Sequence, residues 1–250
     1  MTLFDGDTRI KTVKLAGVVP IVRFANGEII TAATGGKVTF LNQELEVVRA
    51  MSEHETKFRD IRLTANKNYI VWGDRTGRVY FRKRDAPHTL ELSELLKSFM
   101  IYNHKEGITS VDVQNEIVAS GSFDKTVQVW NMASMTKLFD GAHGTTVWCV
   151  KVIDEKVLSC GDKIVRVWSL AGRELYEFRH SNWCNNFDLN MDKTLLAVAH
   201  SDGLSIWNFS SRIKLKEIEI NDVWDVRFNE SGTKLVFGLY DGTIYHTSVV

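Results

Sequence analysis

Short segments with a common pattern of apolar and polar residues recur along the chain. Each segment has apolar residues at its first, fourth and sixth positions, and the alternation of the last two is that of a half-buried strand. The segments are Val19–Phe24, Phe58–Leu63, Ile108–Val113, Val147–Val152, Cys184–Leu189 and Val223–Phe228. Their starts lie 39, 50, 39, 37 and 39 residues apart. This spacing predicts an internal repeat with a period of about 40 residues.

Each segment is followed by further short apolar runs that are separated by turns. In the third repeat the second run is Glu116–Ser122, a turn follows at Phe123–Lys125, and the third run is Thr126–Asn131. A fourth run lies around Leu138. Four short antiparallel strands cannot bury their faces alone, but such units stacked radially form the blades of a β-propeller. We therefore predict an all-β fold built from four-stranded antiparallel blades.

Two of the repeats resemble a known family. The stretch Val118–Asn131 resembles a WD (WD40) repeat with Asn131 in place of the final Asp, and Leu158–Ser169 is similar with one residue fewer in its turn. The resemblance implies a buried tetrad that joins a His before the first strand, a Ser or Thr on the second strand, an Asp in the turn and a Trp on the third strand. The implied tetrads are His104, Ser120, Asp124 and Trp130 in the third repeat and His143, Ser159, Asp162 and Trp168 in the fourth.

The fifth repeat matches this tetrad in part. His180, Asp202 and Trp207 fit the pattern, whereas Ala199 lies near the position of the hydroxyl. The first, second and sixth repeats keep the pattern of strands and lose the tetrad. The whole chain, residues 1–250, is expected to form a single WD-repeat propeller domain.

The ends of the chain suggest how the ring closes. The last repeat has 27 residues after Val223, enough for three strands, and the N-terminal segment Arg9–Leu15 alternates apolar and polar residues. We predict a closed six-bladed ring in which this N-terminal strand completes the last blade. Seven blades are the alternative, and the long second repeat would have to hold the seventh. Its extra residues near Asp85–Leu96 are too few for a blade and predict an inserted loop with a short helix.

Composition narrows the function classes. The chain has 31 Lys+Arg and 31 Asp+Glu in 250 residues, so its formal net charge is zero, which argues against direct nucleic-acid binding. No apolar run is long enough to span a bilayer, and the first ten residues lack the apolar region of a secretory signal. Cys149, Cys160 and Cys184 form no CxxC pair, and we expect small buried side chains in a reducing compartment, the cytoplasm or the nucleus.

The sequence contains no recognisable motif of a catalytic site. The tetrad has the composition of a Ser-His-Asp triad, but a triad needs an exposed nucleophile beside an oxyanion hole. Ala33–Lys37 lacks the upstream Gly and the following Ser or Thr of a phosphate loop. We expect no enzymatic activity, no metal and no cofactor.

The resemblance also implies a partner-binding face, formed by the connections between blades and by the turns between second and third strands. The residues expected on this face are Lys57, Arg59, Arg75, Phe123, Trp148, Trp183, Asn185, Trp224 and Tyr240. Their aromatic content is typical of an interface; alternatively, the three Trp residues pack between blades as core. Basic residues belong to blades two to four and acidic residues to blades five and six. This distribution suggests an acidic or phosphorylated peptide as partner, or else a merely solvated surface.

The sequence thus favours a non-catalytic scaffold or adaptor that binds peptides or domains of other proteins within a larger complex. Repeats three and four also resemble those of F-box/WD substrate receptors, which would make the chain a substrate-recognition subunit of a ubiquitin ligase. A further alternative is a subunit of an RNA-processing or other nucleic-acid-associated complex, held there by protein contacts. The oligomeric state stays open.

Overall fold

The computed structural model describes residues 2–5, 8–12, 21–25, 28–33, 37–52, 62–65, 69–83, 100–101 and 104–249. Side chains are described for residues 28–31, 39–48, 69–81 and 104–249. Lys57, Arg59 and the expected insertion and helix at 85–96 lie outside the described residues.

Five four-stranded sheets and one three-stranded sheet follow one another along the chain, and each is antiparallel with its strands in sequence order. Sheet 1 consists of β3 (Ile21–Ala25), β4 (Glu28–Ala33), β5 (Lys37–Leu41) and β6 (Val47–Ser52). Sheet 2 consists of β7 (Arg62–Ala65), β8 (Tyr69–Gly73), β9 (Val79–Lys83) and β10 (Met100–Ile101). Sheet 3 consists of β11 (Ile108–Gln114), β12 (Ile117–Ser122), β13 (Thr126–Asn131) and β14 (Thr136–Ala142).

The remaining sheets continue the same order. Sheet 4 consists of β15 (Val147–Ile153), β16 (Lys156–Gly161), β17 (Ile164–Ser169) and β18 (Glu174–Arg179). Sheet 5 consists of β19 (Cys184–Leu189), β20 (Leu195–His200), β21 (Gly203–Asn208) and β22 (Lys214–Glu219). Sheet 6 has three strands, β23 (Val223–Phe228), β24 (Lys234–Leu239) and β25 (Ile244–Ser248).

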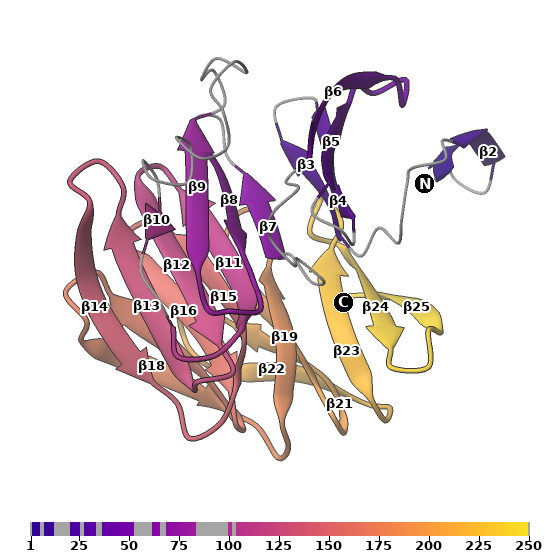
Figure 1. Cartoon of the computed structure of the whole chain (residues 1–250). Helices are drawn as coiled ribbons and strands as arrows, with labels where there is room; N and C mark the ends of the chain where they lie inside the picture. Colours follow the sequence, from indigo (N-terminus) through magenta and orange to yellow (C-terminus); the bar gives the residue numbers. More distant parts are fainter. Residues whose placement is uncertain are drawn as a thin grey trace.

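Consecutive sheets pack through their first strands. β3 contacts β7, β7 contacts β11, β11 contacts β15, β15 contacts β19, and β19 contacts β23 (Figure 1). The second strand of a sheet also contacts the first strand of the next, as β12 does with β15. The first strands therefore lie innermost, which is the arrangement of an all-β propeller.

The core lies between the sheets. Each of the four hydrophobic clusters takes buried side chains from two consecutive sheets, between sheets 2 and 3, 3 and 4, 4 and 5, and 5 and 6. Cys149, Cys160 and Cys184 are free, buried and part of the cluster between sheets 4 and 5. Burial raises the pKa of the Cys184 and Cys160 thiols. A single sheet thus buries its faces only against its neighbours.

The N-terminal segment differs from our expectation. Of Arg9–Leu15, the described part belongs to β2 (Thr8–Thr12), which pairs with β1 (Thr2–Asp5) in a two-stranded sheet of its own. The N-terminal strand therefore does not complete sheet 6, whose described strands number three. Pairing β2 with its neighbour closes a very short loop, whereas pairing with β25 would close a loop of more than two hundred residues at a higher entropic cost.

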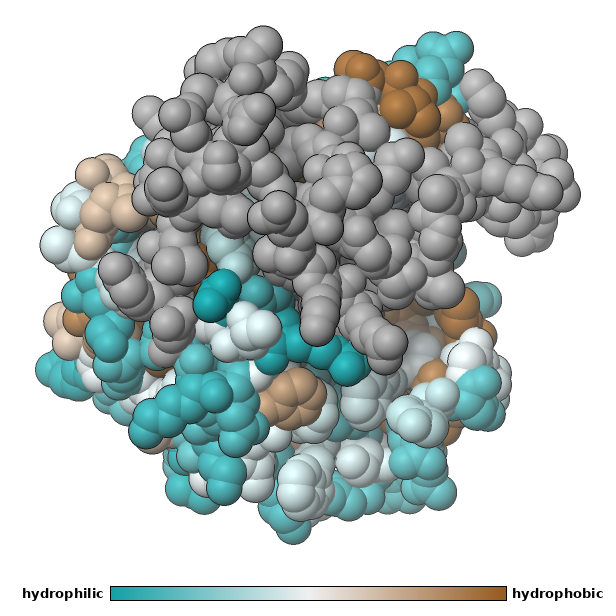
Figure 2. Space-filling model, in the orientation of Figure 1, coloured by the Kyte–Doolittle hydropathy of each residue, from teal (hydrophilic) through white to brown (hydrophobic). Residues whose placement is uncertain are grey.

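The surface is mainly hydrophilic over the described part of the face in Figure 2. Hydrophobic atoms form separate patches there, one of them over β6, where Val47 and Val48 are exposed. No helix in the described part of the chain is long and apolar enough to cross a membrane.

Candidate interaction face

A buried hydrogen-bond network in sheet 3 fixes the loop that precedes β11. His104 is buried, and its Nδ1 lies 3.1 Å from Asp124 Oδ1 and its Nε2 lies 2.9 Å from Ser120 Oγ. Because a carboxylate only accepts, Nδ1 carries the proton and Nε2 accepts from the Ser120 hydroxyl. Burial lowers the pKa of His104, although the Asp124 carboxylate opposes this shift. Trp130, the fourth residue of the expected tetrad, packs on the core cluster between sheets 2 and 3.

Sheet 4 uses a different partner for its histidine. His143 Nε2 lies 2.8 Å from Ser159 Oγ, and Trp168 Nε1 donates to the same oxygen over 2.8 Å. His143 Nδ1, however, lies 2.8 Å from Arg166 Nη1 instead of from Asp162. Burial and the Arg166 charge lower the pKa of His143 to about 4.

Asp162 holds the loop backbone in sheet 4. Its Oδ2 accepts from Gly144 N at 2.7 Å and lies 3.9 Å from Arg166 Nη1. The shorter turn therefore leaves Asp162 bound to the loop and to Arg166, and the guanidinium takes the place beside the imidazole.

Sequence reasoning missed the hydroxyl of sheet 5. Ser205 Oγ on β21 lies 3.1 Å from His180 Nδ1 and accepts from Trp207 Nε1 at 3.0 Å. Residues 205 and 207 share one face of β21 because side chains alternate along a strand, and this spacing is the signal that could have identified Ser205. Asp202 instead accepts from Asn182 Nδ2 at 2.6 Å.

Sheet 2 carries an equivalent network that the sequence reading also missed. Asp74 is buried, accepts from Thr76 N at 2.8 Å and from Arg78 N at 3.0 Å, and receives the Tyr80 hydroxyl at 3.2 Å. Burial and the Asp74 charge raise the pKa of Tyr80 to about 12. In this repeat, which lacks the expected tetrad, a Tyr on the third strand thus donates a hydrogen bond to the Asp of the turn.

These networks support the backbone and expose no nucleophile. Ser120, Ser159 and Ser205 are fully or almost fully buried, so they lack the access that a catalytic Ser needs. Among the described residues, no group of three or more His, Cys, Asp and Glu side chains is placed to hold a metal ion.

Four aromatic side chains form a continuous row across the ends of sheets 3, 4 and 6. We call Phe123, Trp148, Trp224 and Tyr240 the aromatic row. The ring centroids of Phe123 and Trp148 are 5.7 Å apart, those of Trp148 and Trp224 are 5.7 Å apart, and those of Trp224 and Tyr240 are 5.6 Å apart. All three pairs meet edge to face, the arrangement that aromatic quadrupoles favour.

Strand register places the row. Trp148 and Trp224 are the second residues of β15 and β23, and Phe123 and Tyr240 lie in the turns after β12 and β24. In the intervening sheets the second residue is short and polar. Thr109 donates to Val147 O, and Asn185 Nδ2 donates to Val223 O at 2.8 Å. Sheets 3 and 5 therefore use this position to bind the next sheet, whereas sheets 4 and 6 carry the aromatic side chains.

The row is substantially open to solvent. Phe123 is 42% exposed, Trp224 45% and Tyr240 76%, whereas Trp148 is half-buried and packs on the core cluster between sheets 4 and 5. Trp148 thus has both of the roles that we considered, because it belongs to the row and to the core. A row anchored in this way needs little further ordering when a partner binds.

Of the other expected face residues, the structure describes Trp183, Arg75 and Asn185, and none of these three is a member of the aromatic row. Trp183 is 47% exposed in the loop before β19 and makes no ring contact with the row in the described part of the chain. Arg75 is exposed in the β8–β9 turn. Asn185 is half-buried at the joint between sheets 5 and 6. The structure thus brings together four of the expected residues.

Charge is divided across the same face. Exposed cations predominate in the loops and turns of sheets 2 to 4, namely Arg75, Lys105, Lys125 and Lys163, with Glu106 as an exposed carboxylate beside Lys105. Exposed carboxylates lie in those of sheets 5 and 6, namely Asp202, Asp222 and Asp241.

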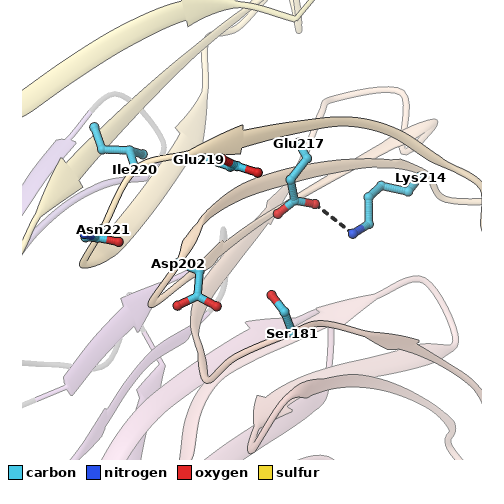
Figure 3. Close-up of a pocket in the computed structure, with 7 residues that line it drawn as sticks. All are labelled: Ser181, Asp202, Lys214, Glu217, Glu219, Ile220 and Asn221. Carbon is cyan, nitrogen blue, oxygen red and sulfur yellow. Dashed lines mark ion pairs between the residues drawn. The ribbon is translucent and has the colours of Figure 1, made fainter.

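A pocket of about 530 Å³ opens beside Asp202. Figure 3 shows it between the β20–β21 turn, which carries Asp202, and β22, which carries Glu217 and Glu219. Glu217 Oε2 is 2.8 Å from Lys214 Nζ, and its Oε1 is 2.8 Å from the Nε2 of buried His200. Burial lowers the pKa of His200. Much of the pocket's polar lining is therefore engaged within the chain.

Comparison with known proteins agrees with this architecture. The WD40 family, described as "WD domain, G-beta repeat", matches residues 94–131 and 135–169. These ranges run from β10 to β17 and so include all of sheet 3 and the first three strands of sheet 4, whose tetrads were the most complete in the sequence. Residues 94–131 and 135–169 thus carry WD40 repeats, and the described sheets have the fold of a WD40 β-propeller.

Two curated proteins are among the similar sequences. WD repeat-containing protein 55 of Bos taurus is 32% identical over 42% of this chain and 29% of its own length. Small ribosomal subunit protein RACK1 of Drosophila melanogaster is 28% identical over 42% of this chain and 34% of its own length. The chain thus matches about a third of the length of these relatives. Neither name indicates an F-box/WD substrate receptor, so the resemblance to those receptors stays a prediction.

Solved structures share the fold at low sequence identity. A chain in the crystal structure of the Mitotic Checkpoint Complex has a TM-score of 0.79 and 19% identity, and the match covers 95% of this chain and 76% of that chain. The computationally designed Ika8 protein has a TM-score of 0.73 and 20% identity, over 93% of this chain and 71% of that chain. WD40 propellers are generally non-catalytic and commonly serve as protein-interaction scaffolds.

Proposed function

We propose that this WD40 protein is a non-catalytic scaffold that binds a segment of a partner protein across the aromatic row. The observation that carries the proposal is the unbroken edge-to-face contact from Phe123 to Tyr240, with three of the four rings open to solvent. Exposed aromatic side chains in contact with one another form the kind of apolar patch that marks interaction sites, and aromatic residues dominate the energetics of such interfaces.

The scaffold also supplies rigidity. Trp148 lies between two buried residues of β15, Trp224 follows buried Val223 in β23, and Asn185 joins sheets 5 and 6. Binding sites on strands are more precise than sites on loops. The row can therefore receive an extended partner segment without a large rearrangement.

The basic side of the face suits an acidic or phosphorylated stretch of the partner. Lys105, Lys125 and Lys163 are exposed there, and Lys125 lies two residues after Phe123. Charge-assisted hydrogen bonds to carboxylate or phosphate would supplement the apolar contacts of the row.

A second candidate role is membership of a ribosome-associated complex through protein contacts. The similarity to RACK1, a small ribosomal subunit protein by name, favours it. The zero net charge of the chain makes protein contacts a better basis for such membership than direct RNA contacts. Partners that are lost from the purified complex on nuclease treatment would identify this role. Partners that the scaffold binds directly should persist under the same treatment.

We also propose that the six sheets are the six blades of one domain that spans residues 1–250. The succession of first-strand contacts from β3 to β23 supports this count. A crystal structure with a seventh sheet between residues 53 and 103 would contradict it.

The binding test replaces the two most exposed large rings of the row. Trp224→Ala with Tyr240→Ala should remove most partners that the wild-type chain captures in affinity purification with mass spectrometry. The matched control is Met191→Ala with Ile213→Ala, which removes two exposed apolar side chains away from the row. Thermal melting should show that both variants are folded. Capture of an unchanged set of partners by the row variant would refute this assignment of the binding face.

A further inference from the structure

Three exposed carboxylates, Asp202, Asp222 and Asp241, lie in the turns and the loop at the Tyr240 end of the aromatic row. Asp222 N donates to Ser201 O at 2.8 Å, and Tyr240 N donates to Asp222 O at 2.9 Å. Asp222 therefore lies between the turn of sheet 5, which carries Asp202, and the turn of sheet 6, which carries Tyr240 and Asp241. The backbone hydrogen bonds hold these groups on one continuous stretch of surface.

None of these carboxylates is neutralised within the described part of the chain. Asp202 accepts from the neutral Asn182 amide at 2.6 Å, Asp241 accepts from Thr243 N at 2.8 Å, and Asp222 has no ion-pair partner there. Lys214, the cation in the adjacent pocket, is held by Glu217 at 2.8 Å. This end of the row therefore presents uncompensated negative charge.

Elsewhere the chain places its own cations over aromatic rings. Lys214 Nζ lies 5.2 Å from the Trp207 ring centroid, Arg212 Cζ lies 5.4 Å from that of Tyr176, and Lys137 Nζ lies 5.8 Å from that of Trp130. Across the described residues, neither Trp224 nor Tyr240 has such a cation. An indole and a phenol ring beside three carboxylates form a surface that attracts a cation both through the ring quadrupole and through charge.

The opposite end of the row has the opposite character. Phe123 is followed within two residues by Lys125, and the loop before β11 exposes Lys105 and one carboxylate, Glu106. The nearby carboxylate of Asp124 is bound to His104 and to Lys105 N. A partner cation would meet like charge at that end. The two ends of the aromatic row therefore differ in charge, and a partner segment can bind in one orientation better than in the other.

We infer that the Trp224–Tyr240 end of the aromatic row binds a lysine or arginine side chain of the partner, with Asp222 and Asp241 pairing with its charge. The inference rests on the proposed function, because it names the chemistry that the same face selects. The occupant is an extended protein segment with apolar residues along the row and a basic residue at the sheet 6 end. Carboxylates or phosphates at its other end would meet Lys125.

Selection from a random peptide library on the immobilised full chain tests this inference. The wild-type chain should enrich peptides that carry Lys or Arg next to apolar or aromatic residues. The variant Asp222→Asn with Asp241→Asn should lose that basic preference and keep the apolar one. Asn suits both positions, since it tolerates the positive φ of 61° at residue 222 and keeps the oxygen that accepts from Thr243 N.

A matched variant controls for net charge. Glu155→Gln with Glu230→Gln removes two exposed carboxylates from other turns and should enrich the same basic peptides as the wild type. For a wild-type-selected peptide, the Asp222/Asp241 variant should bind about threefold to tenfold more weakly at low salt, and added salt should reduce this difference.

The outcomes separate this inference from the proposed function. Enriched peptides with apolar residues but without Lys or Arg would overturn the inference and leave the aromatic row as a binding face. Enrichment of basic peptides that persists in the Asp222/Asp241 variant would overturn it as well. If the wild-type chain enriches no peptide, the proposed function fails and the inference fails with it.

Discussion

At the scale of single residues, the buried histidines of sheets 3 and 4 carry their proton on different ring nitrogens. In sheet 3 the Asp124 carboxylate requires a proton on His104 Nδ1. In sheet 4 the Arg166 guanidinium can only donate, so His143 Nδ1 must accept and Nε2 carries the proton toward Ser159 Oγ. Both imidazoles are neutral, because burial lowers the pKa of each. One residue type thus bridges loop and strand by two different hydrogen-bond patterns.

Replacing Asp124 should destabilise the fold without affecting any reaction. Asp124→Ala removes the carboxylate that accepts from buried His104 Nδ1, from Lys105 N and from Thr126, and the loss of a partner in a buried network costs about 1–3 kcal/mol. Asp192→Ala is a matched control, since Asp192 makes the same contacts to a following Thr in an exposed turn. Urea unfolding should show a clearly larger loss for Asp124→Ala, and equal losses would contradict the role of the buried network.

At the scale of elements, periodicity identified the first strands accurately where the repeats are regular. The segments at 108, 147, 184 and 223 begin β11, β15, β19 and β23. The pairing of β2 with β1 was missed, because alternation predicts a strand but does not name its partner. Arg166 beside His143 was missed as well, because the match to the tetrad assigns Asp162 to that place. A contact that depends on turn length, such as that of Arg166 with His143, needs coordinates, whereas the spacing of Ser205 and Trp207 on one face of β21 was a signal that the tetrad pattern overlooked.

A single methyl group should disturb the pairing of β21 with β22. In Gly203→Ala the added Cβ would lie 2.1 Å from Ile218 O, a backbone atom of the neighbouring strand. The strands must separate locally, and overpacking of this kind costs about 1–3 kcal/mol. Gly238→Ala is the control, because its Cβ would meet only Thr243 O at 4.0 Å. Thermal melting should show several degrees of loss for the first variant and little for the second; similar melting temperatures would contradict the close approach.

At the scale of the whole molecule, two separate sets of contacts connect the sheets. Polar side chains of first strands bind the backbone of the next sheet: Asp112 accepts from Val152 N at 2.8 Å, and Asp188 accepts from Phe228 N at 2.9 Å. Aromatic side chains at the ends of the strands connect the sheets at the surface. The first set fixes the spacing of sheets, and this spacing brings Trp148 within ring contact of Trp224 although sheet 5 lies between them in sequence. Sequence spacing alone predicted the members of the row but not their contact.

The outer strand of sheet 6, β25, has a composition that is typical of a strand covered by another element. The six- or seven-residue outer strands β6, β14, β18 and β22 all carry charged residues, whereas β25 reads Ile-Tyr-His-Thr-Ser and the two-residue outer strand β10 reads Met-Ile. Among the described strands, β25 pairs on one side only, and Ile244 is 73% exposed. Charged side chains on outer strands prevent edge-to-edge association, and β25 has no acidic side chain, Lys or Arg to do so.

The open edge should therefore promote concentration-dependent association of the chain, and one charge should suppress it. Ile244→Lys places a solvated ammonium on β25 and should shift the sedimentation of concentrated samples toward monomer, with little change in melting temperature because the side chain is exposed. Leu215→Lys is the control, since it adds the same charge to β22, an outer strand that already carries several charges. It should leave association unchanged. If Ile244→Lys and wild-type chains associate equally, or if Leu215→Lys suppresses association as strongly, the β25 edge is not the contact.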